Sequence, residues 1–166
     1  MNDLIFKHVE LFDPNSKLWI FQSLTAFKEK EKEIISFNIE RFLKSWNSHG
    51  KEIKSTSLII DSHFIFVFVD SNFLNASGCS IDKLFNKIKE LGVILNKNLI
   101  NNNIIAFRKK SSDLVEFLTF IDLKKKIRNK NIEDNIIIYD NSITALHELK
   151  YWRKSLLDWK KKYIKN

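Results

Sequence analysis

The feature that most constrains the fold is an unbroken run of six apolar residues, Phe64 to Val69, between His63 and Asp70. A strand with one wet face alternates apolar and polar residues, whereas this run does not, so both of its faces need cover. The run therefore predicts the central strand of a sheet. It is far shorter than the roughly 20 apolar residues that span a bilayer, so we expect no transmembrane helix.

Strand and helix patterns alternate on either side of this run. Strands are predicted over 18–22, 56–60 and 103–108, and the segments between them carry apolar residues at the helical spacings of three and four. The two helical stripes are Ile35, Ile39, Phe42, Trp46 and Leu84, Ile88, Leu91, Leu95. The order strand, helix, strand, strand, helix, strand over 18–108 is typical of a ferredoxin-like split βαβ core. We therefore expect an α+β fold, with two helices on one face of an antiparallel sheet.

Residues 109–166 are expected to form a C-terminal β/α extension packed on that core. Strands are predicted over 114–118 and 136–139, and a mostly helical segment over 144–162 carries an amphipathic stripe: Leu149, Trp152, Leu156, Trp159 and Tyr163. Because soluble monomers rarely leave such a stripe in water, Trp152 and Trp159 are predicted to pack against the body of the domain. With one Pro, three Gly and no apparent internal repeat, residues 1–166 are expected to form a single domain.

Most of the net charge of +8 lies in residues 150–166, where seven cations stand against Asp158 and give +6. A basic tail with interleaved aromatic residues could contact the phosphates of a nucleic acid while its rings stack on the bases. The candidate tail residues are Arg153, Lys154, Lys160, Lys161 and Lys162. The alternative is codon bias, because Ile, Asn and Lys make up 64 of the 166 residues and share the AT-rich codons expected of an AT-rich genome.

The residues with the clearest chemical potential gather around the loop from Asp70 to Asp82. Cys79 is the single cysteine, so it cannot form an internal disulfide, which fits a reducing, cytoplasmic location. It stands near a predicted helix start, where the helix dipole favours a reactive thiolate. The first helix is expected to end at His49 and Gly50, on the same edge of the sheet as the loop.

We therefore expect a ligand or partner surface formed by His49, Asp70, Ser77, Gly78, Cys79, Ser80 and Asp82. Cys79 with His49 as its base would suit a cysteine-dependent enzyme or a redox protein. The structural alternatives are a tight turn for Cys79, a loop cap for Asp70 and a solvated helix end for His49. No paired Cys or His motif accompanies these residues, so no metal and no cofactor is predicted.

Four sequence blocks carry a family resemblance: WIFQ (19–22), FLKSWNSHG (42–50), FVD (68–70) and ASGCSID (76–82). In this order they resemble a small, uncharacterised family of Bacteroidetes proteins that is commonly labelled "ABC transporter ATPase". Beyond residue 108 the likeness is carried by IIIYDN and the Trp-containing tail. The family motif continues with small polar residues where this chain has Lys83. The resemblance implies a fold and a lineage, and it implies no activity.

The ATPase label does not fit the glycines of this chain. A P-loop needs G-x-x-x-x-G-K-[ST], but Gly50-Lys51 is followed by Glu52, and Ser45 stands where the first glycine belongs. We therefore do not expect P-loop ATPase activity. The sequence favours a non-enzymatic cytoplasmic binding or adaptor protein that uses the Asp70–Asp82 loop to bind an unknown protein or small molecule. A cysteine-dependent enzyme or redox protein and a nucleic-acid-binding protein are the alternatives.

Overall fold

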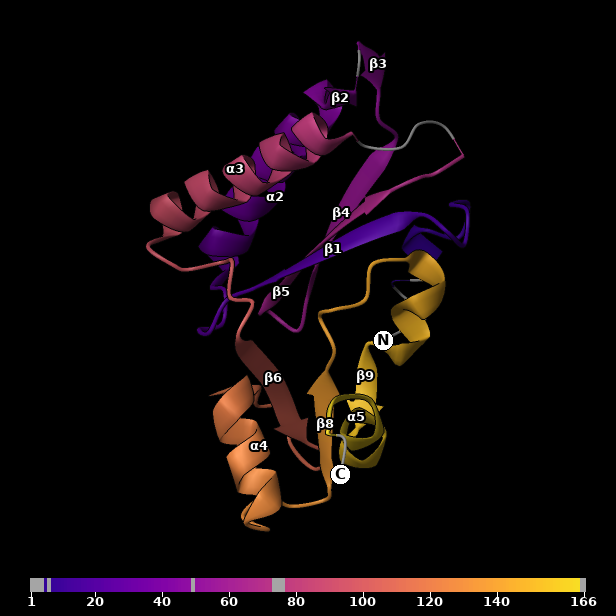
Figure 1. Ribbon diagram of the computed structural model, residues 1–166. Helices are drawn as coiled ribbons and strands as arrows, with labels where there is room; N and C mark the ends of the chain where they lie inside the picture. Colours follow the sequence, from indigo (N-terminus) through magenta and orange to yellow (C-terminus); the bar gives the residue numbers. More distant parts are fainter. Residues whose placement is uncertain (1–4, 6, 49, 73–76, 165–166) are drawn as a thin grey trace. The chain divides into compact units, whose positions relative to one another are not determined.

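The computed structural model describes residues 5, 7–48, 50–72 and 77–164, and it has the predicted α+β class (Figure 1). The chain divides into two compact units. The first unit holds residues 1–101 and 144–149, and the second unit holds 102–143 and 150–166. The predicted core over 18–108 extends across the boundary between the units, and the single-domain organisation stays a prediction. Among the helices that the structure describes, none is long and apolar enough to cross a membrane.

The first unit is built on an antiparallel sheet with the strand order β1-β5-β4, formed by β1 (Lys17–Gln22), β5 (Phe64–Val69) and β4 (Ser55–Ile60). All six residues of β5 are buried, which confirms the predicted central strand. The hairpin between β4 and β5 turns at Asp61 and Ser62, whose φ angles are 49° and 54°. Two consecutive left-handed residues give a tight turn whose twist matches that of the strands.

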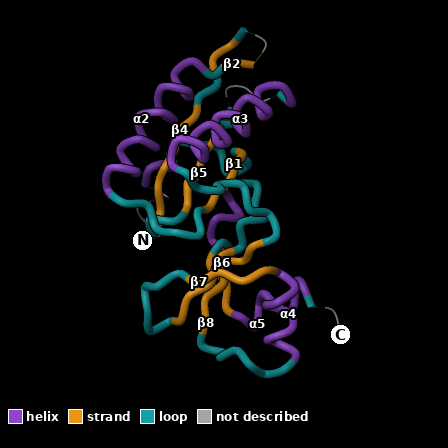
Figure 2. The backbone as a smooth tube through the Cα atoms, turned by 90° about the vertical axis from the view of Figure 1, so that its left-hand side faces the viewer, coloured by secondary structure: helices purple, strands orange, loops and turns teal. Residues whose placement is uncertain are grey.

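Two helices, α2 (Glu29–Ser45) and α3 (Gly78–Leu95), pack on this sheet (Figure 2). Their buried stripes share one apolar core with the β5 residues Ile65, Val67 and Val69. The prediction that the first helix ends at His49 and Gly50 is wrong, because α2 ends at Ser45. The chain then forms the short strands β2 (Asn47–Ser48) and β3 (Lys51–Glu52), which pair with each other.

The fourth strand of the expected ferredoxin-like core does not join this sheet. That strand is β6 (Ile104–Lys109), and it pairs with strands of the second unit. The edge of β1 is instead contacted by loop segments, because Leu18 N–H donates to Thr144 O at 3.0 Å and Gln22 N–H donates to Leu99 O at 3.3 Å. The order β1-β5-β4 is thus the one that a ferredoxin-like core has, but β6 does not pair with the free edge of β1. The order of strands along the chain does not decide which distant strand pairs with that edge.

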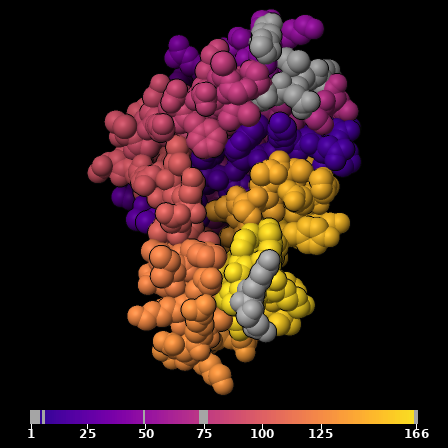
Figure 3. All heavy atoms as spheres, in the orientation of Figure 1, coloured from indigo at the N-terminus to yellow at the C-terminus, as the bar shows by residue number. Residues whose placement is uncertain are grey.

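The second unit is an antiparallel sheet with the strand order β7-β6-β8-β9. The further strands are β7 (Glu116–Thr119), β8 (Ile136–Tyr139) and β9 (Arg153–Ser155). The helices α4 (Phe120–Arg128) and α5 (Leu156–Tyr163) follow β7 and β9. One apolar core joins both helices to the sheet: Phe107, Leu123, Ile136, Ile138, Leu156 and Trp159. In Figure 3, α4 lies within the orange segment, whose side chains form part of the visible surface.

The segment 144–162 is mostly helical, as predicted, but its amphipathic stripe does not lie on one continuous helix. These residues form a 3₁₀ helix, η1 (Leu146–Tyr151), then β9 and then α5. Trp152 and Trp159 are fully buried, as predicted. The apolar residues have helical spacing, but the segment after Trp152 is extended because it pairs with β8. The Trp152 ring packs against Tyr139 of β8, with ring centroids 5.0 Å apart.

The second unit consists of two ββα halves, which contradicts the expectation that the chain has no internal repeat. The first half is β6-β7-α4 and the second is β8-β9-α5, and the halves meet where β6 pairs with β8. The helices of the two halves also match in sequence, because TFIDLKKKI (119–127) aligns with SLLDWKKKY (155–163). The strands before the helices differ in length and sequence, so the repeat is short and easily missed.

Both repeated helices begin with the same cap. The hydroxyls of Thr119 and Ser155 accept the N–H of Asp122 and Asp158, at 3.0 and 3.1 Å. The same hydroxyls donate to the carboxylates of these aspartates, at 2.6 and 2.7 Å. This arrangement satisfies an N–H group at the helix start and places a negative charge at the positive end of the dipole. The two halves therefore share local chemistry as well as topology.

Candidate functional site

The loop from Asp70 to Asp82 is described at its two ends, while His49 and residues 73–76 lie outside the described residues. The end of α2 contacts the start of α3, because the indole Nε1 of Trp46 donates to Ser80 O at 2.9 Å. This contact joins the two segments that the sequence places at one edge of the sheet.

Asp70 is fully buried and holds the start of the loop. Its Oδ1 accepts the N–H groups of Asn72 and Asp13 at 3.1 and 3.3 Å, and the Nζ of Lys54 lies 3.0 Å from its Oδ2. Burial would raise the pKa of Asp70, but the hydrogen bonds from Asn72, Lys54 and Asp13 outweigh burial and lower the pKa. These contacts favour the loop-capping role of Asp70 over a role in ligand binding.

The other candidates of the loop lie at the N-terminal end of α3, from its cap Ser77 to Asp82. Ser77 caps the helix, because its Oγ accepts the N–H of Ser80 at 3.4 Å, and the buried Ser80 hydroxyl donates to Ser77 O at 2.8 Å. Gly78, Cys79 and Asp82 are exposed, and no described side chain hydrogen-bonds the thiol. Within the described residues, no group of three His, Cys, Asp or Glu side chains could hold a metal ion.

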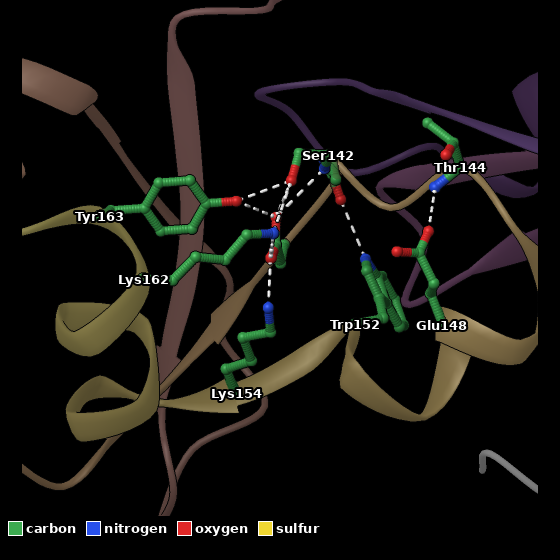
Figure 4. A network of polar contacts seen from close by, with 9 residues as sticks. Ser142, Thr144, Glu148, Trp152, Lys154, Lys162 and Tyr163 are labelled. Carbon is green, nitrogen blue, oxygen red and sulfur yellow. Dashed lines mark hydrogen bonds and ion pairs between the residues drawn. The ribbon is translucent and has the colours of Figure 1, made fainter.

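A polar cluster of the second unit surrounds Asp140, which the sequence offered as part of the IIIYDN block and not as a candidate site residue (Figure 4). Asp140 is only 4% exposed. Its Oδ1 accepts the hydroxyls of Ser142 and Tyr163 at 2.5 and 2.9 Å, and its Oδ2 accepts the Nζ of Lys154 and Lys162 at 2.5 and 3.2 Å. These partners lie up to 23 residues away and follow no periodicity, so the sequence contains no signal for the cluster.

The protonation states show what this cluster can do chemically. Burial would raise the pKa of Asp140, but the hydrogen bonds from Lys154, Ser142 and Tyr163 lower the pKa to about 2. The neighbouring Tyr163 hydroxyl and the Asp140 carboxylate raise the pKa of Lys162. A general base works best with a pKa near the operating pH, so neither group is tuned to activate the Ser142 hydroxyl. The cluster instead ties the end of β8 to β9 and α5.

The lysines of the predicted basic tail are paired with carboxylates of the second unit. Lys154 and Lys162 contact Asp140, Lys160 lies 3.4 Å from Asp134, and Lys161 lies 3.2 Å from Asp158. The Arg153 guanidinium lies over the rings of Tyr139 and Trp152. Asp134 and Asp140 precede residue 150, so the charge of +6 counted over 150–166 leaves them out. The tail is less positive in the fold than in the sequence.

A different basic surface lies on α4 and just beyond its end. We call it the α4 face: Lys125, Lys126, Arg128 and Lys130, all exposed. Among the described residues, no hydrogen-bond or ion-pair partner contacts these four side chains. Asp122 is the one acidic residue of the segment 119–130, and it belongs to the helix cap, so the segment has a net charge of +4.

The net charge is divided unequally between the two units. The first unit has 13 Lys and Arg residues and 13 Asp and Glu residues, and its net charge is zero. The second unit has 15 cations and 7 anions, so it carries the entire net charge of +8. The boundary between the units has no Pro-rich or Gly-rich linker, which is why the sequence alone does not show this division.

No protein-family model matches the chain, and neither the curated proteins nor the solved structures include a significant match. The resemblance carried by the ASGCSID block stays a prediction.

Proposed function

We propose that the protein is a non-enzymatic binding protein of the cytoplasm whose second unit binds the phosphate backbone of a nucleic acid. The observation that carries this proposal is that the second unit, 59 residues long, holds the whole net charge of +8. Each cation that neutralises a phosphate releases a condensed counterion, and this release drives sequence-independent binding.

Codon bias explains part of the lysine content but does not explain its distribution. The two units have the same frequency of acidic residues, 13 among 107 and 7 among 59. Their frequencies of basic residues differ about twofold, with 13 among 107 and 15 among 59. A bias of the genome acts on both units, so the excess of cations in the second unit needs a further cause, and binding to a polyanion supplies one.

The kind of cation favours contacts to phosphates over contacts to bases. Twelve of the 15 cations in the second unit are Lys, and Arg is the residue that reads base edges with its planar fork. Two of the three arginines are engaged within the unit, because Arg108 donates to Ser112 O at 3.0 Å and Arg153 packs on aromatic rings. We therefore expect binding without strong sequence preference.

The alternatives centred on the Asp70–Asp82 loop have less support. Asp70 and Ser77 are engaged in the turn and the helix cap, and none of the described side chains hydrogen-bonds the Cys79 thiol. The family resemblance adds no activity to either alternative.

The proposal is tested with the full chain and fluorescein-labelled 20-base-pair DNA and 20-nucleotide RNA, by anisotropy from 50 to 200 mM salt. If about four cations contact phosphates, the slope of log K against log salt for the duplex is about −3.6, and affinity falls roughly 100-fold over this range. No binding at 50 mM salt, or binding that salt does not weaken, would overturn the proposal.

A charge-matched control variant belongs to the same experiment. Lys30, Lys44, Lys83 and Lys89 are exposed lysines of the first unit, and changing all four to Gln removes four charges. We expect this variant to bind within about twofold of the unchanged protein, because the contacts belong to the second unit. A loss of tenfold or more would show that total charge, and not the second unit, determines binding.

A further inference from the structure

We infer that the phosphate-binding surface of the second unit is the α4 face, and that the repeated helix α5 does not share this role. The inference rests on the proposed function, because it names the residues that would contact the nucleic acid. It comes from comparing the two ββα halves, which share the order of their elements and the cap of their helices.

The two helices share their cap and the pattern of their side chains, but they differ in whether their lysines form ion pairs. Both carry three consecutive lysines, at 124–126 and 160–162, one turn after the same cap. Both expose an apolar residue at the second helical position, Ile121 at 76% and Leu157 at 63%. Differences in anion binding between the halves must therefore come from the residues around the lysines.

On α5 each of these lysines lies beside a carboxylate, in the order Asp134, Asp158 and Asp140. Together with Lys154, the α5 cluster has four cations and three anions, and its net charge is +1. At physiological salt the Debye length is about 8 Å, so these adjacent carboxylates act on any phosphate that approaches the lysines. The α5 cluster therefore attracts a phosphate only weakly.

Among the described residues, no ion pair joins the corresponding lysines of α4 to a carboxylate, and the one acidic residue nearby in the sequence is Asp122 of the helix cap. The equivalent of Asp158 is Asp122, yet no ion pair between Asp122 and Lys125 forms in the described structure. The Nζ of Lys124 lies over the Phe120 ring, 5.3 Å from its centroid. The four side chains of the α4 face have no acidic partner among the described residues. The segment keeps its net charge of +4 and is the stronger attractor of phosphate.

The dimensions and polarity of the α4 face favour a nucleic acid over a lipid surface. Within α4, Lys125 to Arg128 span about 4.5 Å at the helical rise of 1.5 Å per residue, and Lys130 lies just beyond the helix end, so these cations can meet neighbouring phosphates of one strand. An interfacial helix inserts a continuous apolar face into the membrane, whereas the exposed large apolar side chain of α4 is Ile121. A phosphate backbone needs no apolar insertion.

The test compares two double variants with equal charge. Lys125→Gln/Lys126→Gln removes two cations of the α4 face, and Lys160→Gln/Lys161→Gln removes two from α5. For the labelled duplex at 100 mM salt, we expect the α4 variant to bind at least tenfold more weakly, with a salt slope smaller by about 2, since each lost phosphate contact lowers the slope by about 1. The α5 variant is expected to bind within twofold.

Cations in the last turn of a helix also stabilise it through the dipole, so thermal unfolding is measured for each variant. If the first α4 variant is less folded, Arg128→Gln/Lys130→Gln is used in its place and is expected to weaken binding to a similar extent. Lys125→Arg/Lys126→Arg keeps the charge and is expected to keep the affinity.

Three outcomes decide the inference. Equal losses in the α4 and α5 variants, or a larger loss in α5, would overturn the inference and leave the proposed function standing. Absence of binding by the unchanged protein would instead overturn the proposed function. Binding to phosphatidylserine vesicles that is as tight as binding to DNA, and equally dependent on the α4 face, would assign the surface to a membrane.

Discussion

The two units of this protein come from one lysine-rich chain and treat its charges differently. In the first unit cations and anions alternate, as in the segment from Lys28 to Glu33 at the start of α2, and the net charge is zero. In the second unit Asp134, Asp140 and Asp158 each lie beside a lysine of the α5 cluster, and none of the described acidic residues forms an ion pair with the α4 face. The comparison teaches that net charge is informative about function only when it is counted separately for each structural unit.

The units also share a feature, because each buries an aspartate directly after an interior strand. Asp70 follows β5 and Asp140 follows β8, and each accepts the N–H two residues on, at 3.1 and 3.2 Å. They differ in their lysines. Asp70 has Lys54, whose side chain is 41% exposed, whereas Asp140 has Lys162 and the 13% exposed Lys154. The more basic unit thus holds its buried carboxylate more strongly.

The largest effect that we expect concerns the core of the second unit. Trp159 is fully buried between α4 and α5, with ring centroids 5.7 Å from Phe120 and 5.0 Å from Tyr163. A unit of this size has a small core, so Trp159→Ala is expected to lower the free energy of unfolding by about 3–5 kcal/mol. Urea unfolding followed by circular dichroism measures the loss.

Leu157→Ala is the matched control on the same helix, because Leu157 is exposed, and its loss is expected to stay within about 0.5 kcal/mol. A loss below about 1 kcal/mol for Trp159→Ala would mean that the repeated helices are not held by a common core. Trp46→Ala makes the corresponding change in the first unit, where Trp46 is also buried, and its loss is expected to be of the same size.

The parts of the fold that the sequence predicts well depend on neighbouring residues. The run Phe64–Val69 needs no distant partner to indicate a buried strand, and the stripe of α3 reports a helix in the same way. The stripe from Leu149 to Tyr163 misleads because its spacing is helical, while the pairing of β9 with β8 makes the chain after Trp152 extended. That pairing joins residues well apart in the sequence, which local patterns do not record.

The candidate site was harder to predict for the same reason. The acids that neutralise the basic tail include Asp134, which is 26 residues from Lys160, and Asp140, which is 14 residues from Lys154. Counting charge within a window of sequence therefore overestimates the positive charge of the tail, whereas the segment 119–130 keeps its +4. The match between TFIDLKKKI and SLLDWKKKY is visible in the sequence, but it becomes informative only once both segments are known to follow paired strands.

The next largest effect concerns the buried aspartates. The pKa of Asp140 is lowered from 3.8 to about 2, so its ionised form stabilises the fold by about 2 kcal/mol. Because the pKa is lowered, this stability is present above about pH 5 and is lost as the pH falls toward 2. Asp140→Asn is expected to cost about 2–3 kcal/mol at pH 7 and little at pH 2, as measured by urea unfolding across this range.

Asp70→Asn provides the comparison from the first unit. The pKa of Asp70 is also lowered, and because fewer lysines contact it we expect a smaller pH-dependent loss. A loss for Asp140→Asn that stays constant between pH 7 and pH 2 would show that the Lys154 and Lys162 contacts do not stabilise the carboxylate.

The smallest effect tests the repeat itself. Thr119→Ala and Ser155→Ala each remove the hydroxyl that caps a helix of the second unit, and each is expected to cost about 1 kcal/mol. The two losses are expected to agree within about 0.5 kcal/mol, because both hydroxyls accept an aspartate N–H and donate to the same aspartate at closely similar distances. Urea unfolding of the two variants, side by side, gives the comparison.

Ser77→Ala removes the cap of α3 in the first unit and serves as the reference. Its hydrogen bond to the Ser80 N–H is longer, at 3.4 Å, and the residue three positions on is a serine without charge, so no carboxylate adds to the cap. We therefore expect a smaller loss than for either cap of the second unit. If Ser77→Ala cost more than both, or if the losses for Thr119 and Ser155 differed by more than about 1 kcal/mol, the two ββα halves would not be energetically equivalent. Differences in binding between α4 and α5 could then no longer be assigned to the carboxylates beside α5 alone.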